Sequence, residues 1–384
     1  MNKLGCRKGA FMRVLFAAGG TGGHINPALA AAQELRGRFP DARILFVGTA
    51  KKMEAQLVPK AGFDFKTIDI SGFQRSFAPA DILHNIGTLR RLLFVTGQCK
   101  KIINEFKPDV VVGFGGYVSG PVVRTAHKLG IKTAVHEQNA FPGKTNIALS
   151  KYADAVMLTS PNAEKYLKCS VKPVITGLPV RKELLCTDRD EARKKLGIPN
   201  GVSVVLATGG SLGAESINNV MCDILPMYAG NSRLFFIHGY GQLGRFVPDR
   251  LREKGLDPDN IPNARVSEYI YDMADCMAAA DLVISRAGAS SLAEIEALGK
   301  TSLLVPSPYV SENHQYHNAM ALVEKNAAIL IEQKNLRSEK VKEIIDDLTA
   351  DPEKYRKIGV NARNMSVCDA QKKICDIIVG LVGD

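Results

Sequence analysis

The chain has 384 residues, a formal net charge of +11 and a pI of about 9.2, and 46% of its residues are hydrophobic. This length suggests roughly two globular domains, each with enough apolar residues for its own core. A basic chain often binds nucleic acid or an anionic membrane surface, but no RNP motif, zinc finger or helix-turn-helix pattern is present. No apolar run reaches the roughly 20 residues of a membrane span. We therefore expect a globular protein that binds no nucleic acid.

The eight cysteines are scattered, and none forms a C-x-x-C pair. This usage is typical of a reducing compartment and gives no zinc-site spacing. Residues 1–11 are predicted to be a loose leader, with the first domain beginning at Met12. A signal peptide is disfavoured, because Arg13 interrupts the apolar stretch and no small-residue cleavage site follows.

Short apolar runs alternate with helical patterns along most of the chain, and they are rich in Val, Ile and Leu without polar alternation. This pattern is typical of parallel strands buried on both faces, so we predict two doubly wound α/β halves. Glycine and proline near Gly177–Arg181 place the boundary there, giving domains 12–181 and 182–365. The predicted strands are Arg13–Ala18, Ile44–Val47, Val110–Val112, Thr133–Val135, Ala155–Leu158, Val174–Thr176, Val202–Ala207, Leu234–Ile237, Leu282–Ser285 and Ser302–Val305.

A glycine loop, Gly19–Gly23, follows the first strand and precedes a helical pattern, with His24 at the start of that helix. Such a loop lets the backbone approach an anion and directs helix N–H groups at it. An imidazole there could accept a proton from a hydroxyl group. The alternative is that His24 only caps the helix. A second strand–glycine loop–helix arrangement occurs at Gly209–Ala214.

Nucleotide motifs of other kinds are absent. The glycine spacing is wrong for a dinucleotide site, and no carboxylate directly follows Ile44–Val47. The two Gly-Lys-Thr triplets lack the preceding glycine of a phosphate-binding loop. The Asp188–Asp190 and Asp257–Asp259 pairs are predicted to cap a helix and to form a turn. We therefore expect no metal site and no required cofactor.

Polar or glycine-rich segments follow several other predicted strands, where ligands of open parallel sheets bind. They are Gly113–Pro121, His136–Asn139, Ser285–Glu294 and Pro306–Gln315. Ser290 and Ser291 open a helix that could hold a diphosphate, and Glu294 could accept ribose hydroxyls. Tight turns, solvated loops and a helix-dipole carboxylate remain open as alternatives.

A predicted helix, Ile82–Ile103, is apolar with basic surroundings. One core stripe is predicted to contain Ile82, Ile86, Leu89 and Leu93. Four apolar residues lie outside it: Leu83, Leu92, Phe94 and Val95. Apolar residues in a basic setting suit an anionic bilayer surface. A more widely buried helix is equally compatible with the pattern.

Taken together, these motifs give a specific resemblance. Gly19–His24 with Asn26–Ala30, Gly115–Pro121, His136–Asn139, Gly209–Ser211, Arg286–Glu294 and Asn313–Gln315 occur in this order. From about Met12 onward, the chain resembles the MurG family of bacterial N-acetylglucosaminyltransferases. The resemblance implies a GT-B fold, with two Rossmann-like doubly wound domains and a cleft between them. It also implies that the last helix, about residues 366–384, returns to the N-terminal domain.

The resemblance further implies inverting transfer from UDP-N-acetylglucosamine to undecaprenyl-diphospho-N-acetylmuramoyl-pentapeptide. It implies peripheral attachment to the cytoplasmic face of the bacterial membrane, with cell-wall synthesis and division proteins as partners. His24 is the expected base, assisted by Glu137 or Asn139. Gly19, Gly20, Tyr117 and Ser119 are expected to bind the acceptor. The residues expected to touch the donor are Thr21, Gly22, Gly23, Asn139, Arg181, Ser211, Ile270, Ala289, Ser290, Ser291, Leu292, Ala293, Glu294 and Gln315.

The chain departs from the family pattern at three of these loops. Leu178 stands where asparagine is usual, Leu212 where glutamine is frequent, and Ser291 where threonine is common. The two leucines remove polar contacts beside Arg181 and Ser211. Two other functions remain open: a UDP-N-acetylglucosamine 2-epimerase, and a non-catalytic membrane subunit that presents a sugar nucleotide.

Overall fold

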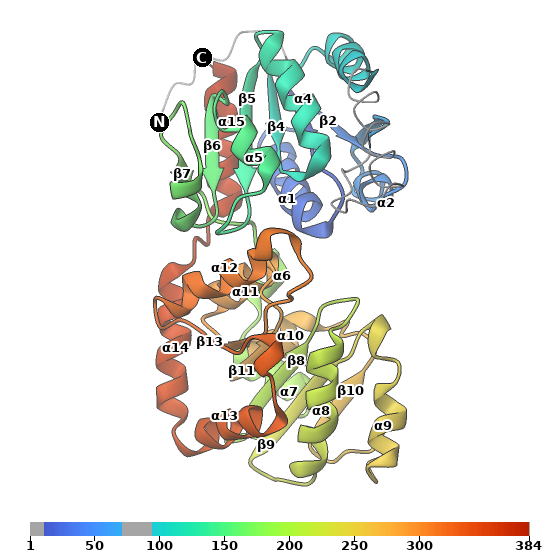
Figure 1. The fold of residues 1–384 in the computed structure, drawn as a ribbon, viewed down its shortest axis with the longest axis vertical. Helices are drawn as coiled ribbons and strands as arrows, with labels where there is room; N and C mark the ends of the chain where they lie inside the picture. Colours follow the sequence, from blue (N-terminus) through green and yellow to red (C-terminus); the bar gives the residue numbers. More distant parts are fainter. Residues whose placement is uncertain (1–10, 71–93, 384) are drawn as a thin grey trace. The chain divides into compact units, whose positions relative to one another are not determined.

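The computed structural model describes residues 11–70 and 94–383. The chain divides into two compact units (Figure 1). Unit 1 runs to Pro179 and also contains Asp369 onward, whereas unit 2 is Val180–Cys368. Each unit is built on a parallel sheet with helices on both faces.

The sheet of unit 1 has seven parallel strands in the order β3-β2-β1-β4-β5-β6-β7. In its centre, Val14 pairs with Ile44 on one side and Val110 on the other. Central strands consist of aliphatic and aromatic residues because both of their faces are covered. The strands are β1 (Arg13–Ala17), β2 (Arg43–Gly48), β3 (Asp64–Thr67), β4 (Val110–Gly113), β5 (Lys132–Glu137), β6 (Ala155–Leu158) and β7 (Val174–Ile175).

Successive residues of β1 point to opposite faces of this sheet. Val14 and Phe16 join a core with α1 (Gly22–Arg38) and α15 (Ala370–Gly383). Leu15 and Ala17 face α4 (Gly116–Lys128), α5 (Lys144–Leu149) and the helical residues 94–106. Figure 1 shows α4 in front of the strands and α15, in dark red, behind β5. The C-terminal helix therefore completes the core of unit 1, while α2 (Glu54–Lys60) lies beside β2 and β3.

Unit 2 has six parallel strands in the order β10-β9-β8-β11-β12-β13. One face of this sheet forms a core in which Val205 and Ala207 pack with α8 (Glu215–Met227), α9 (Val247–Glu253) and α13 (Ser338–Ala350). The strands are β8 (Ser203–Thr208), β9 (Leu234–Gly239), β10 (Ala264–Ser267), β11 (Leu282–Ser285), β12 (Thr301–Leu304) and β13 (Ile329–Leu330). The other helices are α6 (Lys182–Cys186), α7 (Arg189–Lys195), α10 (Met273–Ala279), α11 (Ala289–Leu298), α12 (His314–Val323) and α14 (Pro352–Met365).

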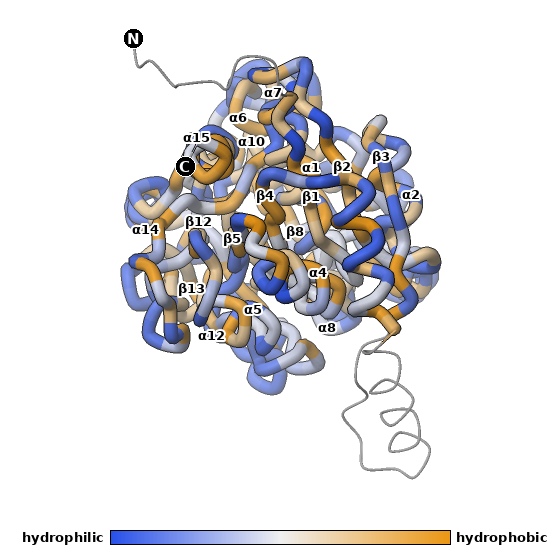
Figure 2. Tube along the Cα trace, turned by 90° about the horizontal axis from the view of Figure 1, so that it is seen from above, coloured by the Kyte–Doolittle hydropathy of each residue, from blue (hydrophilic) through white to orange (hydrophobic). Residues whose placement is uncertain are grey.

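The predicted α/β alternation is confirmed, and each predicted strand is present within about two residues of its expected bounds. Three strands were not predicted, and all of them lie at sheet edges: β3, β10 and β13. An edge strand has less of its surface covered, so it need not be apolar, and β3 reads Asp-Phe-Lys-Thr. Figure 2 shows the corresponding contrast between hydrophobic central strands such as β4 and hydrophilic outer segments.

The apolar basic helix predicted over residues 82–103 can be judged only in part, because residues 71–93 lie outside the described chain. The same holds for residues 1–10 of the predicted leader. Residues 94–106 are helical, and Phe94 is 77% exposed. Val95 is fully buried in the core of unit 1, so at this residue the structure favours the more widely buried helix over a membrane-facing surface. Within residues 11–70 and 94–383, no helix combines the length and hydrophobicity required to cross a membrane.

The strand order reverses at the same place in both sheets, between β1 and β4 in unit 1 and between β8 and β11 in unit 2. Loops that leave the carboxyl ends of two such strands diverge, and the crevice between them is the usual ligand site of this architecture. The loops at these positions are Gly19–Gly23 and Phe114–Gly116 in unit 1, and Gly209–Ala214 and Arg286–Gly288 in unit 2.

Candidate active site

His24 lies in the first turn of α1, directly after the glycine loop. Its Nδ1 atom is 3.3 Å from the carbonyl oxygen of Gly19 and 3.2 Å from Oγ1 of Thr21. A carbonyl oxygen can only accept a hydrogen bond, so this contact favours the tautomer with the proton on Nδ1. Nε2 then carries the lone pair, which is the state required of a proton acceptor.

The loop between β4 and α4 packs against this histidine. Gly115 has a φ of +87°, and a Cβ atom there would lie 2.9 Å from Cδ2 and 3.1 Å from Nε2 of His24. Gly116 has a φ of +75°, and its Cβ would lie 2.4 Å from the Gly19 carbonyl oxygen. These two glycines are therefore required by the backbone and by the approach of the two loops to each other. Contacts within the protein therefore explain Gly115 and Gly116 without the close approach of a ligand.

The polar segment predicted to follow β5 belongs partly to that strand, since β5 ends at Glu137. The His136 ring is fully buried, and its Nε2 lies 3.0 Å from the Gly177 carbonyl oxygen. Burial lowers the pKa of His136 to about 4, so the ring is neutral near pH 7. His136 thus anchors the segment that leaves unit 1 and does not face a ligand.

Glu137 is also buried, and both of its carboxylate oxygens are occupied. Oε1 accepts hydrogen bonds from the backbone and side-chain amides of Asn139, and Oε2 accepts from Gly143 N and Asn146 Nδ2, all at 2.8–3.1 Å. Burial raises the pKa of Glu137, although these four donors oppose the shift. Its role in the structure is to hold the 139–146 loop, and Asn139 is oriented by it.

Two acceptor-binding predictions fall on α4, and the structure separates them. The Ser119 hydroxyl is fully buried, 2.7 Å from the carbonyl oxygens of both Ala17 and Gly115. It joins β1 to the second loop, which corrects the expectation that it contacts the acceptor. Tyr117 is partly exposed, and its ring lies beside Gly20. Thr21 and Gly23 are exposed and Gly22 is partly exposed, so this edge of the loop is accessible.

In unit 2, helix α11 begins after Gly288 at the switch point, with no acidic residue in its first turn. Ala289 and Ser290 are partly exposed and Ser291 is exposed, whereas Leu292 and Ala293 are buried, so only backbone groups of the last two could reach a ligand. The positive end of the helix dipole at this position favours an anion.

Glu294 and Arg181 form an ion pair, with 3.0 Å between Oε1 and Nε. The Glu294 side chain is 19% exposed and that of Arg181 is 57% exposed. Burial raises the pKa of Glu294, and the Arg181 charge opposes this shift. Both residues were predicted to bind the donor, and the structure brings them together.

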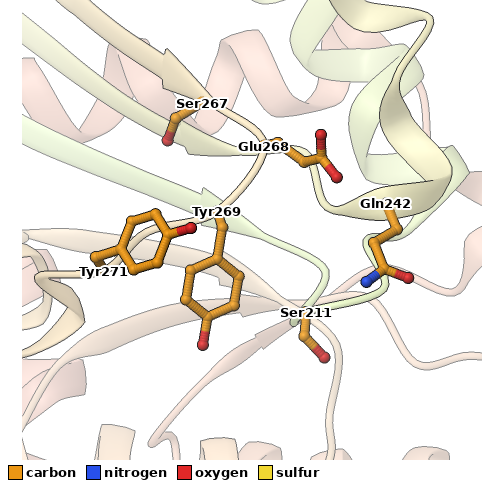
Figure 3. A pocket seen from close by; sticks show the side chains of 6 residues that line it. All are labelled: Ser211, Gln242, Ser267, Glu268, Tyr269 and Tyr271. Atoms are coloured by element: carbon orange, nitrogen blue, oxygen red, sulfur yellow. The ribbon is translucent and has the colours of Figure 1, made fainter.

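A pocket of about 470 Å³ opens beside the loop that follows β10 (Figure 3). The rings of Tyr269 and Tyr271 lie 4.9 Å apart, and the former is 49% exposed while the latter is 90% exposed. Ile270, between them, turns inward against Gly239 and is 5% exposed. The pocket is lined by Ser211, Gln242, Ser267, Glu268, Tyr269 and Tyr271.

Of these lining residues, only Ser211 was predicted. The sequence does carry a signal for the others, because two tyrosines flank Ile270 in a loop after a strand, and exposed aromatic side chains are common at binding sites. Ser267 adds a buried hydroxyl oxygen for which the described protein supplies no hydrogen-bond partner.

Arg286 directly follows β11, and Gln315 lies in the first turn of α12. The Gln315 side-chain oxygen accepts a hydrogen bond from Ser307 N at 2.8 Å, which fixes the loop after β12. The Arg286 guanidinium donates to Val305 O, Ser216 Oγ and Gln333 Oε1, all of them neutral groups. Burial lowers the pKa of Arg286. A guanidinium is nevertheless so strong a base that this group remains charged near neutral pH.

The two Asp-x-Asp pairs have structural roles. Asp188 accepts hydrogen bonds from Asp190 N and Glu191 N at the start of α7, at 2.9 and 3.0 Å. Asp257 accepts from Asp259 N and Asn260 Nδ2 within a turn. Among the residues that the structure describes, no three His, Cys, Asp or Glu side chains gather as a potential metal site.

Comparison with known families assigns both units. Residues 14–158 match the glycosyltransferase family 28 N-terminal domain, and residues 204–374 match the glycosyltransferase family 28 C-terminal domain. These two matches cover most of the chain and contain both switch-point loops of each unit.

Relatives of known name are similar over nearly the whole length. UDP-N-acetylglucosamine–N-acetylmuramyl-(pentapeptide) pyrophosphoryl-undecaprenol N-acetylglucosamine transferases of Acetivibrio thermocellus and Bacillus cytotoxicus are 42% and 39% identical to the chain. The alignments cover 96% and 97% of this chain and 97% and 100% of the relatives.

Among solved structures, Acinetobacter baumannii MurG matches with a TM-score of 0.76 and 29% identity, covering 96% of this chain and 99% of that protein. A UDP-GlcNAc 2-epimerase from Neisseria meningitidis matches with a TM-score of 0.65 at 16% identity, which shows a shared fold only. The fold is therefore GT-B, with two Rossmann-like domains, and the chain belongs to glycosyltransferase family 28 and, within it, to the MurG family.

Proposed function

We propose that this protein transfers N-acetylglucosamine from UDP-N-acetylglucosamine to the 4-hydroxyl of N-acetylmuramic acid in undecaprenyl-diphospho-N-acetylmuramoyl-pentapeptide, with inversion at the anomeric carbon. The substrates are those named for the relatives that align over the whole chain. The proposed role of His24 as the base rests on the contact of its Nδ1 atom with the Gly19 carbonyl oxygen. This contact leaves Nε2 as the basic atom at the switch point of unit 1.

The proposed reaction is a single displacement. Nε2 of His24 takes the proton of the acceptor 4-hydroxyl while the oxygen forms a bond to the anomeric carbon. The bond from that carbon to the diphosphate oxygen breaks, and its electron pair leaves with UDP. General base catalysis of this kind contributes a rate factor of about 10²–10⁴.

Unit 2 is proposed to hold the donor. The start of α11, with Ser290 and Ser291, faces the diphosphate, and the Arg286 charge supports the anion from β11. Glu294 accepts ribose hydroxyls while Arg181 keeps its carboxylate oriented. Ser211 and the pocket that contains Tyr269 and Tyr271 lie beside the nucleotide, and Gln315 forms hydrogen bonds with the sugar. These groups hold the leaving charge without a metal ion.

In unit 1, the partly exposed Gly20 and Tyr117 are proposed to meet the acceptor diphosphate. Thr21, Gly22, Gly23 and Asn139 are proposed to contact the donor. Glu137 acts by positioning Asn139, since its own oxygens are saturated.

A lipid acceptor implies work at a membrane surface. The net charge of +11 and the exposed Phe94 fit peripheral binding to anionic lipid at the cytoplasmic face. Proteins of cell-wall synthesis and division are the expected neighbours there.

One assay tests the proposed reaction: the purified protein is incubated with sugar-labelled UDP-N-acetylglucosamine and a soluble analogue of the lipid acceptor. We expect label in the lipid product, joined through a β-linkage. Label released as free N-acetylmannosamine would instead indicate an epimerase, and an absence of turnover until a second protein is added would indicate a presenting subunit.

A further inference from the structure

Glu54 is a fully buried carboxylate that none of the proposed steps uses. It is the first residue of α2, yet its side chain points back to the ends of β1 and β2. Oε1 accepts hydrogen bonds from Thr49 N at 3.1 Å and Thr49 Oγ1 at 2.7 Å. Oε2 accepts from Gly20 N at 3.2 Å. A buried carboxylate in this setting needs such donors, because isolated burial of its charge would be costly.

Two glycines leave the space that this side chain occupies. A Cβ atom on Gly48 would lie 2.5 Å from Cγ of Glu54, and a Cβ on Gly19 would lie 2.8 Å from its Oε1. The glycine at position 19 therefore leaves room both for this carboxylate and for Val118, whose Cγ2 would lie 2.7 Å from the same Cβ. The anion-loop interpretation does not explain this glycine.

The peptide group between Gly19 and Gly20 connects Glu54 to His24. Its N–H, on Gly20, donates to Glu54 Oε2, and its C=O, on Gly19, lies 3.3 Å from Nδ1 of His24. A peptide whose N–H faces a carboxylate has a more negative carbonyl oxygen, because successive hydrogen bonds polarise one another. That oxygen then binds an Nδ1–H group more strongly.

We propose that Glu54 is a positioning residue that fixes the Nδ1–H tautomer and the ring orientation of His24 through the Gly19–Gly20 peptide. The arrangement has the logic of a carboxylate–histidine pair, with one peptide group inserted between the two side chains. The effect on His24 does not depend on the proposed function, whereas its consequence for the transfer rate does.

Tyr117 and Gly116 also lie beside the Gly19–Gly20 peptide. Tyr117 lies beside Gly20, makes a hydrogen bond with Thr49 and is close enough to Glu54 for the carboxylate charge to act on it. The backbone of Gly116 packs against the Gly19 carbonyl oxygen, which would lie 2.4 Å from a Cβ atom on Gly116. The competing explanation is that Glu54 only secures the end of β2 through Thr49. Thr49→Val provides the matched control, because it removes one donor to Glu54 while leaving the carboxylate and its contact with Gly20.

The tautomer can be read directly from the imidazole ¹⁵N shifts of the intact protein, with His24 assigned by comparison with His24→Gln. In the wild-type protein we expect a protonated Nδ1 and an unprotonated Nε2. Glu54→Gln should shift the population toward the Nε2–H form, since an amide cannot accept from both Thr49 and Gly20 and carries no charge. Thr49→Val should keep the wild-type pattern.

Kinetics give the second readout. Glu54→Gln should lower kcat at least tenfold with little change in KM for UDP-N-acetylglucosamine, while Glu54→Asp recovers part of the rate. A predominantly Nε2–H ring in the wild-type protein would overturn the proposal even if no variant folds. An unchanged tautomer in a folded Glu54→Gln protein would overturn it as well. A tautomer shift in a protein that transfers no sugar would uphold the relay and refute the proposed function.

Discussion

Gly115 shows how closely a single residue can be tied to the proposed base. Substitution with alanine would add a methyl carbon 2.9 Å from Cδ2 and 3.1 Å from Nε2 of His24, too close for an ordinary contact, at a φ of +87°. We expect Gly115→Ala to lower kcat at least tenfold by displacing the ring, with UDP-N-acetylglucosamine affinity nearly unchanged. Steady-state kinetics with both substrates and donor titration would measure this.

The control for this substitution is Gly130→Ala. Gly130 has a φ of +73°, and no atom lies within 4 Å of its virtual Cβ. In both variants a left-handed alanine should lower the folding stability by about 1–2 kcal/mol. Only the alanine at position 115 would also contact the His24 ring. Equal losses of activity in the two proteins would show that the contact with the ring is unimportant.

Individual residues mark the limit of what could be predicted from sequence. His24 could be proposed as the base because a histidine after four glycines has a chemically distinctive setting. Ser119 was misplaced, since a serine in a glycine-rich loop looks the same whether its hydroxyl faces solvent or a buried carbonyl. Glu54 gave no signal, because a glutamate at the first position of a helix is ordinary. Only the fold brings it to Gly20.

At the scale of the element, helix α11 carries two glutamates that allow a matched comparison. Glu294 pairs with Arg181 at the switch point, whereas burial alone raises the pKa of Glu296 to about 7. Glu294→Gln should raise KM for UDP-N-acetylglucosamine roughly 10- to 100-fold, the cost of a charged hydrogen bond to ribose of about 1.5–3 kcal/mol. Glu296→Gln should leave KM unchanged. Similar KM values for the two variants would exclude Glu294 from the ribose site.

Elements were predictable where burial on both faces forces an apolar composition, as in β4 with its run Val110–Val112. They were missed at the sheet edges, as in β10, whose four residues are all only partly buried. The pocket beside β10 was missed for the same reason, since its tyrosines follow a strand that the hydrophobic pattern does not reveal.

For the whole molecule, one buried histidine in each unit predicts acid sensitivity. Burial lowers the pKa of both His136 and His238 from 6.5 to about 4. Between these values the unfolded chain binds protons that the folded protein does not, so stability falls as the pH drops below 6.5. Lowering the pH to 5 should cost about 2 kcal/mol per histidine.

Urea unfolding at pH 7 and pH 5 would measure this loss, with His136→Gln and His238→Gln as comparisons. Each substitution should reduce the pH dependence of the unit that contains it. A wild-type protein whose unfolding free energy is the same at both pH values would contradict the assignment of these rings as neutral and buried.

In the proposed reaction, unit 1 supplies the base and unit 2 holds most of the donor. The most direct test is the turnover of His24→Ala with UDP-N-acetylglucosamine and the lipid acceptor analogue, with donor affinity measured on the same protein. We predict a kcat lower by about 10²–10⁴, with donor affinity close to that of the wild type. Near-normal turnover of this variant would contradict the assignment of His24 as the base.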